Sequence, residues 1–176
     1  MANGRICILV GPEYEDLEVW YPKLRLEEAG WEVVLAGIGG DREYRGKHGY
    51  PCKVDVQTRD VGAESLAGIL APGGWAPDKL RRDADVLALV RAVDERKKMV
   101  ATICHGPWIL ISAGILRGRK LTSTVGIKDD VTNAGATWVD EPAVIDGNLV
   151  SARVPKDLPA FGKAMLEVLA SRGSSR

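Results

Sequence analysis

The chain has 176 residues, of which 45% are apolar and 27% charged, and its 24 basic and 24 acidic side chains give a formal net charge of zero. This composition predicts one globular domain with a sizeable core, over residues 1–176. The balanced charge predicts no electrostatic attraction to nucleic acid or to a membrane surface. No apolar run approaches the roughly 20 residues that span a bilayer, and the chain does not open with a signal-peptide pattern.

The N-terminal part predicts a parallel β–α–β unit. Residues 5–10 and 32–37 are β-rich runs, and the first of them ends at a Gly-Pro turn signal. Between them, apolar residues at helical spacing form one face of a helix: Leu17, Trp20, Tyr21 and Leu24. Residues 39–56 hold glycines between short β-prone pieces, which predicts a hairpin or an irregular excursion.

The alternation of strands and helices continues along the chain. A strand over residues 65–71 ends in Pro72-Gly73-Gly74, and Asp83 can N-cap a helix whose apolar face carries Val86, Leu89, Val90 and Val93. A strand at 99–103 and a helix at 107–113 follow. Later strands are predicted at 121–124, 137–139, 143–145 and 149–152, with a helix at 127–134 and a turn at 146–148. The last helix begins near Asp157 or Leu158, buries Leu158, Phe161, Met165, Val168 and Leu169, and leaves 171–176 as a polar tail.

This order predicts an α/β fold, an open and mostly parallel sheet with helices on both faces. Sites in such folds lie at the carboxyl ends of the strands, where the loops at 11–16, 72–78 and 104–107 would meet. No GxGxxG pattern follows the first strand and no P-loop lysine pattern is present, so nucleotide binding is not supported.

Cys104 is the strongest candidate for a functional residue. The apolar run 99–103 leads directly into it, and His105, Gly106 and Pro107 follow. This order predicts a strand that enters a helix through a tight turn, where the helix N-terminus favours a thiolate over a thiol. The alternative is a small core residue, the commonest role of a free cysteine. Its place at a sharp turn beside polar residues favours a reactive thiol.

His105 and a Gly-Gly turn are further candidates. His105 could accept a proton from Cys104 or donate one to a substrate oxygen, although adjacent side chains are not expected to bond directly and a carboxylate would have to orient the imidazole. Alternatively it is a loop histidine that titrates near neutral pH. Gly73 and Gly74 could present N–H groups to an oxyanion or form a plain turn.

Four acidic residues surround the predicted start of the first helix: Glu13, Glu15, Asp16 and Glu18. Acidic side chains at a helix start can simply satisfy the helix dipole. One of them must nevertheless lie at the mouth where Cys104 lies. A buried carboxyl beside a thiolate would have a raised pKa and could hydrogen-bond to the sulfur.

The cysteines and histidines do not suggest a metal or a disulfide framework. Cys7, Cys52 and Cys104 are odd in number and far apart, which favours a reducing cytoplasm. The two histidines are His48 and His105, and the adjacent Cys104 and His105 would chelate poorly. We expect no metal and no cofactor.

Eight stretches, in order and over nearly the whole chain, carry a family resemblance: EYEDLE at 13–18, GKHGY at 46–50, PGGWAP at 72–77, ICHGP at 103–107, LISAGILRGRK at 110–120, GIKDD at 126–130, NAG at 133–135 and RVPKDLPAF at 153–161. By these stretches the chain resembles the PfpI intracellular protease/deglycase family of the glutamine-amidotransferase-like superfamily. The resemblance implies a flavodoxin-like three-layer sandwich with Cys104 on a strained nucleophile elbow.

The resemblance also implies roles for other residues. Glu15 would be the carboxyl that hydrogen-bonds the thiolate, and Gly73, Gly74 and the His105 amide would form the oxyanion site.

A homo-oligomer, dimer or hexamer, is implied too. In PfpI-type members an acidic residue from a neighbouring subunit orients the histidine, and the matching position here is Asp78, where the family usually has Glu. Trp75, in the same loop, is compatible with an interface. Thr124 stands where the prototype carries an aromatic residue, which would alter pocket shape or substrate preference.

The activity implied is that of a cysteine-dependent enzyme that attacks a carbonyl carbon. We favour a glyoxalase III or protein deglycase activity on methylglyoxal, related dicarbonyls or their adducts, because a small substrate suits a site at a subunit interface. One alternative is an intracellular cysteine peptidase. The other is a redox-sensing, stress-protective protein that uses oxidation of Cys104.

Overall fold

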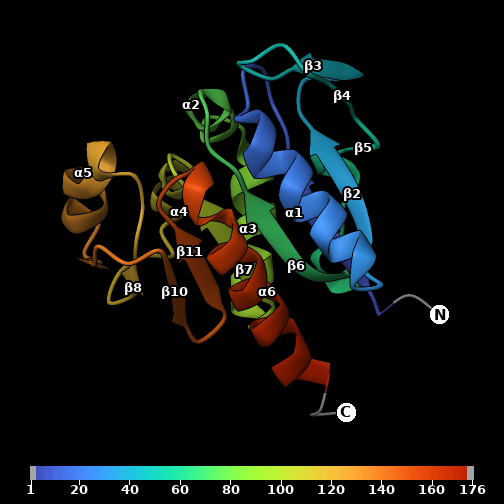
Figure 1. The fold of residues 1–176 in the computed structure, drawn as a ribbon. Helices are drawn as coiled ribbons and strands as arrows, with labels where there is room; N and C mark the ends of the chain where they lie inside the picture. Colours follow the sequence, from blue (N-terminus) through green and yellow to red (C-terminus); the bar gives the residue numbers. More distant parts are fainter. Residues whose placement is uncertain (1–2, 174–176) are drawn as a thin grey trace.

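A seven-stranded sheet forms the centre of the structure, a computed structural model that describes residues 3–173 (Figure 1). The strand order is β10-β11-β7-β6-β1-β2-β5. The strands are β1 (Arg5–Leu9), β2 (Glu32–Gly37), β5 (Val56–Gln57), β6 (Leu66–Ala71), β7 (Met99–Ile103), β10 (Ala143–Asp146) and β11 (Leu149–Ala152). All neighbours pair in parallel except β10, which pairs antiparallel with β11 across the predicted turn at 146–148.

Helices cover both faces of this sheet (Figure 1). On one face α1 (Asp16–Glu28) packs beside α6 (Leu158–Gly173), and on the other α3 (Ala84–Glu95) packs beside α4 (Pro107–Ala113), which also contacts α2 (Ala76–Leu80). The expected α/β three-layer sandwich with a mostly parallel sheet is therefore confirmed. No helix within residues 3–173 is both long and apolar enough to cross a membrane.

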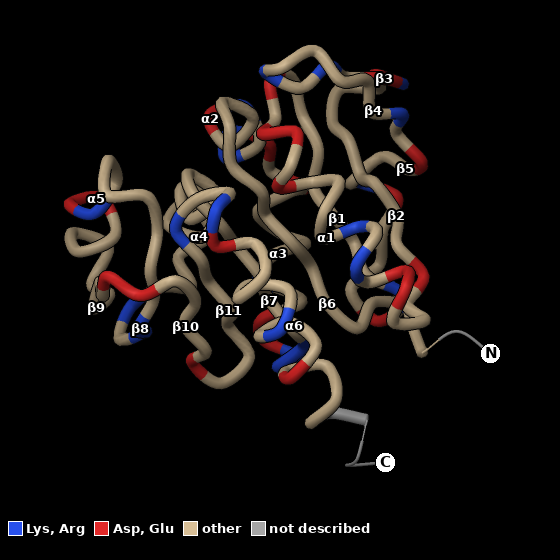
Figure 2. The backbone as a smooth tube through the Cα atoms, viewed as in Figure 1, with Lys and Arg blue, Asp and Glu red and all other residues tan. Residues whose placement is uncertain are grey.

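Shorter elements lie outside the central sheet. The glycine-containing excursion is an antiparallel hairpin, β3 (Glu43–Arg45) with β4 (Pro51–Lys53), and β8 (Lys120–Leu121) pairs in parallel with β9 (Thr137–Trp138). Helix α5 (Lys128–Asn133) follows a 3-10 turn at Val125–Ile127, and further 3-10 turns lie at Thr58–Asp60, Ala63–Ser65 and Pro155–Asp157. Both basic and acidic residues lie on these outer elements (Figure 2).

Helix α1 does not bury the apolar face expected of it. Leu17 and Leu24 are 56% and 60% exposed. The side of the helix turned inward instead carries Glu18, Val19, Pro22 and Leu26. Docking on the sheet and on α6 selects this side, so an acidic residue is carried into the interior. This rotation of the helix decides which carboxyl reaches the site.

The other helical faces follow the sequence pattern. Asp83 caps α3 by accepting the N–H groups of Asp85 and Val86, and the predicted face of α3 is buried. The five residues predicted to be buried by α6 all lie in the core. Helix α6 extends through Gly173, so residues 171–173 are helical rather than tail, and 174–176 lie outside the described residues. The strand expected at 121–124 is shorter, because it ends at Leu121.

Candidate active site

Strand β7 ends at a strained turn. Cys104 has φ of +59°, a left-handed conformation that costs free energy for a residue with a Cβ. The backbone passes so close to β6 that a Cβ on Gly106 would lie 2.1 Å from the carbonyl oxygen of Ala71. Helix α4 then begins at Pro107. The tight turn predicted between strand and helix is present, with the thiol at its tip.

The Cys104 sulfur contacts its sequence neighbour. Sγ lies 3.3 Å from Nδ1 of His105, and the N–H groups of His105 and Gly74 donate toward the sulfur. The expectation that these adjacent side chains would not bond directly is wrong, and the left-handed conformation of Cys104 accompanies the contact. The thiol therefore has both a proton acceptor and two amide donors beside it.

The carboxyl beside Cys104 belongs to Glu18, and the expectation that Glu15 occupies this place is wrong. Glu18 is fully buried, and its Oε2 accepts the Gly73 N–H at 2.7 Å. Its Oε1 is buried with no hydrogen-bond partner within residues 3–173. The spacing of Val19, Pro22 and Leu26 on the same face of α1 was the available signal for Glu18.

Thiol and carboxyl control each other's protonation. Burial raises the pKa of Glu18 to about 8, and the charge of Glu15 adds to the shift. Burial, followed by the charge of Glu18, raises the pKa of Cys104 to about 12, against the N–H groups of His105 and Gly74. Because both anions oppose each other in a desolvated site, the pair carries at most one negative charge near neutral pH. Burial and then the Lys47 charge lower the pKa of His105, which favours neutral imidazole.

Gly73 and Gly74 allow the close approach of three segments. A Cβ on Gly73 would lie 2.5 Å from Glu18 Oε2 and 2.7 Å from the Cys104 Cβ, and a Cβ on Gly74 would lie 2.4 Å from the Glu15 nitrogen. The Gly73 N–H is already engaged by Glu18, so the expectation that it serves an oxyanion is wrong. The Gly74 N–H is directed at the site.

The backbone of Thr124 contacts the backbone of Cys104. Its N–H donates to the Cys104 carbonyl oxygen at 3.2 Å. It therefore anchors the elbow, and Thr124 also lines a cavity of about 390 Å³ together with Trp138 and Arg153.

His105 lies between two indole rings. Its ring centroid is 5.7 Å from that of Trp75 and 5.1 Å from that of Trp108. Asp78 does not orient it within the described chain, because both Asp78 oxygens accept from Arg82, at 2.6 and 2.7 Å, on the surface of α2. This bond lowers the pKa of Asp78. A contribution of Asp78 from a neighbouring subunit stays a prediction.

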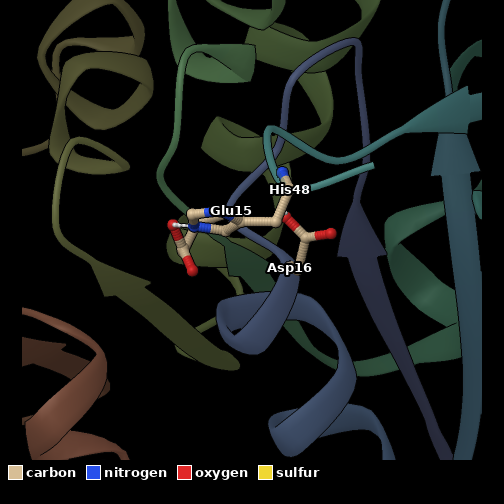
Figure 3. A group of neighbouring side chains, drawn as sticks. All are labelled: Glu15, Asp16 and His48. Carbon is tan, nitrogen blue, oxygen red and sulfur yellow. Dashed lines mark hydrogen bonds and ion pairs between the residues drawn. The ribbon is translucent and has the colours of Figure 1, made fainter. Parts of the chain in front are cut away.

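Glu15, Asp16 and His48 gather where the β3–β4 loop meets the start of α1 (Figure 3). One ligand atom from each lies within 4.8 Å of the others, a spacing that could hold a metal ion. Both Asp16 oxygens, however, accept backbone N–H groups, from His48 and Tyr50 at 3.0 Å, and Glu15 Oε2 already binds the Lys47 ammonium at 2.7 Å. The group is therefore better explained as an anchor for the loop than as a metal centre.

Comparison with known proteins identifies the relatives of this chain. Residues 4–168 match the sequence profile of the DJ-1/PfpI family. A deglycase of Pyrococcus horikoshii is 46% identical over 94% of this chain and 99% of its own length, and a putative cysteine protease of Bacillus subtilis is 39% identical over 95% and 99%. A two-domain protein of Anabaena variabilis with DJ-1/ThiJ/PfpI-like and ferritin-like domains superimposes with a TM-score of 0.92 at 39% identity, over 95% of this chain and 48% of its own.

Proposed function

The chain belongs to the DJ-1/PfpI family, and we propose that it is a cysteine-dependent enzyme of the glyoxalase III/deglycase type, acting on methylglyoxal, related dicarbonyls or their adducts. The observation that carries the proposal is the strained Cys104, with the His105 imidazole at 3.3 Å and the buried Glu18 carboxyl beside it. The deglycase names of relatives at 44–46% identity support it.

The chemistry begins with attack of the Cys104 sulfur on the aldehyde carbon of the dicarbonyl. The thiol proton passes to Nδ1 of His105, and the oxygen of the hemithioacetal accepts the N–H groups of Gly74 and His105. A proton then moves from the former aldehyde carbon to the neighbouring carbon, whose oxygen takes the proton held by His105, which gives a 2-hydroxyacyl thioester and neutral His105. Water hydrolyses this thioester to a 2-hydroxy acid and returns the thiol, so no external oxidant or reductant is consumed.

Glu18 is the group best suited to the proton transfer between the two carbons. Its pKa of about 8 means that it is mostly protonated at neutral pH and can both give and take a proton. Its Oε1 is buried without a hydrogen-bond partner within residues 3–173, so it has the capacity to bond a substrate oxygen once a substrate occupies the site. In this scheme His105 accepts the thiol proton, and Glu18 transfers the proton between the two substrate carbons.

A substrate panel tests the proposal against its enzymatic alternative. Methylglyoxal, a methylglyoxal adduct of a thiol and an unstructured peptide would be offered to the wild type and to Cys104→Ser. We expect turnover of the first two by the wild type alone. Peptide cleavage without dicarbonyl turnover would favour the cysteine peptidase, which the name of the Bacillus subtilis relative supports.

The non-enzymatic alternative rests on the same sulfur. A half-buried cysteine whose sulfur lies beside a carboxyl could be held as a sulfinic acid, with Glu18 in place of the expected Glu15 as its hydrogen-bond partner. Selective dioxidation of Cys104 by mild peroxide, measured by mass spectrometry and with no turnover of any panel substrate, would favour this redox-sensing role. The three free cysteines suit a reducing cytoplasm.

We also propose that the protein acts as a homo-oligomer in which Asp78 of one subunit orients His105 of another. His105 has aromatic neighbours but no carboxylate partner within residues 3–173. Trp75 contacts the His105 ring, directly precedes α2, and is 56% exposed. To reach a neighbouring subunit, Asp78 would have to break its ion pair with Arg82, and an exposed ion pair of this kind contributes little to stability.

A further inference from the structure

Trp75 is a large apolar side chain exposed beside the nucleophile turn. Its ring centroid lies 5.7 Å from that of His105, and Nδ1 of the same imidazole lies 3.3 Å from the Cys104 sulfur. Trp75 is nevertheless 56% exposed, while its backbone N–H donates to the Glu13 carbonyl oxygen at 2.9 Å. Single exposed apolar side chains are common on protein surfaces. What distinguishes this one is that a single imidazole ring separates it from the sulfur.

The loop that carries Trp75 packs directly on the nucleophile turn. A Cβ on Gly73 would lie 2.7 Å from the Cys104 Cβ and 3.0 Å from the His105 nitrogen. The N–H of the next residue, Gly74, is directed at the sulfur. Because Gly74 and Trp75 are consecutive, one segment carries both the amide that would hold a substrate oxygen and the exposed indole.

A second indole, that of Trp108, also contacts His105, but its surface is already used. Its centroid lies 5.1 Å from that of the imidazole, and its Nε1 donates to the Asp130 carboxylate at 2.8 Å. The Arg81 guanidinium lies over the ring, 5.6 Å from the centroid. Of the two indoles beside His105, that of Trp75 therefore offers the more open surface to a ligand.

We propose that Trp75 is a specificity-determining residue of the Cys104 site, which packs against the group next to the reacting carbon. An aromatic pair attracts beyond the burial of its surface, so the site should favour electrophiles that carry a planar aromatic group there. The inference rests on the proposed function and names its substrate class: dicarbonyl compounds with an aryl substituent in preference to those with a methyl group. A substrate oxygen bound to the Gly74 N–H would hold that substituent beside Trp75.

Two alkylating reagents that differ by one phenyl group test this without turnover. Iodoacetamide and its N-phenyl derivative carry the same iodomethyl carbon, which the Cys104 thiolate attacks with loss of iodide. The rate of modification by each is measured at one pH by mass spectrometry of the Cys104 peptide. The phenyl-to-parent ratio of rates is then divided by the same ratio for a small free thiol. This phenyl preference cancels the thiolate fraction and the intrinsic reactivities, so it reports the attraction of the site for the ring.

We expect Trp75→Leu to lower the phenyl preference by about fivefold and Trp75→Phe, which keeps an aromatic face, to retain most of it. The matched control is Leu24→Ala, which removes another exposed apolar side chain, on α1, and should leave the preference unchanged. The ratio of kcat/KM for phenylglyoxal to that for methylglyoxal should fall in Trp75→Leu in the same proportion.

A phenyl preference in Trp75→Leu within twofold of the wild type would overturn the inference, whatever the protein turns over. Trp75→Phe falling as far as Trp75→Leu would overturn it too, because the loss would not follow the aromatic ring. If the preference falls as expected while no dicarbonyl is consumed, the aromatic wall stands and the proposed function fails.

Light scattering on each variant covers the other role open to an exposed indole, contact with a second copy of the chain. A fall in mass with an unchanged phenyl preference would assign Trp75 to that contact and overturn the inference. Modification of Cys104 by iodoacetamide itself, at the wild-type rate, confirms that the nucleophile turn is still formed in the variants. Because Trp75 is exposed, its replacement leaves a folded protein to measure.

Discussion

The Glu18 carboxyl accepts the Gly73 N–H with its Oε2 at 2.7 Å, and the same buried carboxyl lies beside the Cys104 thiol. This contact links helix α1, the loop that follows strand β6 and the turn that carries Cys104. It also makes ionisation of the thiol less favourable when the carboxyl is charged, because the Glu18 charge raises the pKa of Cys104. The predictions below test this arrangement first.

Glu18→Gln should make Cys104 more acidic and the enzyme slower. The amide keeps an oxygen for the Gly73 N–H but removes the charge that raises the thiol pKa, so the apparent pKa of Cys104 alkylation should fall. The loss of proton transfer should reduce kcat by about 10²–10⁴. The pH profile of iodoacetamide modification and steady-state kinetics measure the two effects. An unchanged alkylation pKa would contradict the contact.

Glu18 should also make stability depend on pH. Its pKa is about 8 in the folded protein and 4.5 in the unfolded chain, so between these values the folded state binds the extra proton. Stability therefore falls as pH rises from about 4.5 to about 8, by on the order of a few kcal/mol for this group. Urea unfolding at pH 5, 6.5 and 8 should show this fall in the wild type relative to Glu18→Gln. Parallel curves for the two proteins would count against it.

Gly106→Ala should destabilise the fold strongly. The added methyl group would meet the Ala71 carbonyl oxygen at 2.1 Å, and the backbone of the elbow would have to move. We expect a loss of about 3 kcal/mol or more in the free energy of unfolding. Gly126→Ala is the matched control, because nothing lies within 4 Å of its added Cβ. Equal effects of the two substitutions would show that the elbow is not tightly packed against β6.

Asp78 should matter only in an assembled protein. Asp78→Asn should lower kcat by about 10-fold or more if the carboxylate orients His105 of another subunit, since a neutral amide supports the imidazolium less well. Asp78→Glu keeps a carboxylate at this position and should retain activity. Light scattering checks the premise: a monomeric mass together with full activity would remove Asp78 from the site.

The sequence was sufficient for the parts of the site that are local. Cys104, His105 and Pro107 follow one another, so the strand, turn and helix could be predicted from adjacent residues. The layers of the fold also followed from the alternation of strands and helices, as the pairing of β1, β2, β6 and β7 shows.

The residues that contact the Cys104 thiol from other elements could not be predicted from the sequence around them. Four acidic residues lie near the start of α1, and only the rotation of the helix on the sheet decides that Glu18 points inward while Glu15 meets Lys47. The expected apolar face with Leu17 and Leu24 failed for the same reason. The pairing of Glu15 with a lysine 32 positions along the chain depends on the β3–β4 hairpin, whose docking no periodicity predicts.

The most direct test of the account is product formation from methylglyoxal by purified wild type and Cys104→Ala. Lactate would be quantified against consumed methylglyoxal, with the fold of each protein checked by circular dichroism. We predict stoichiometric lactate from the wild type and none above the uncatalysed rate from Cys104→Ala. Equal lactate formation by the two proteins would contradict Cys104 as the nucleophile and with it the proposed function.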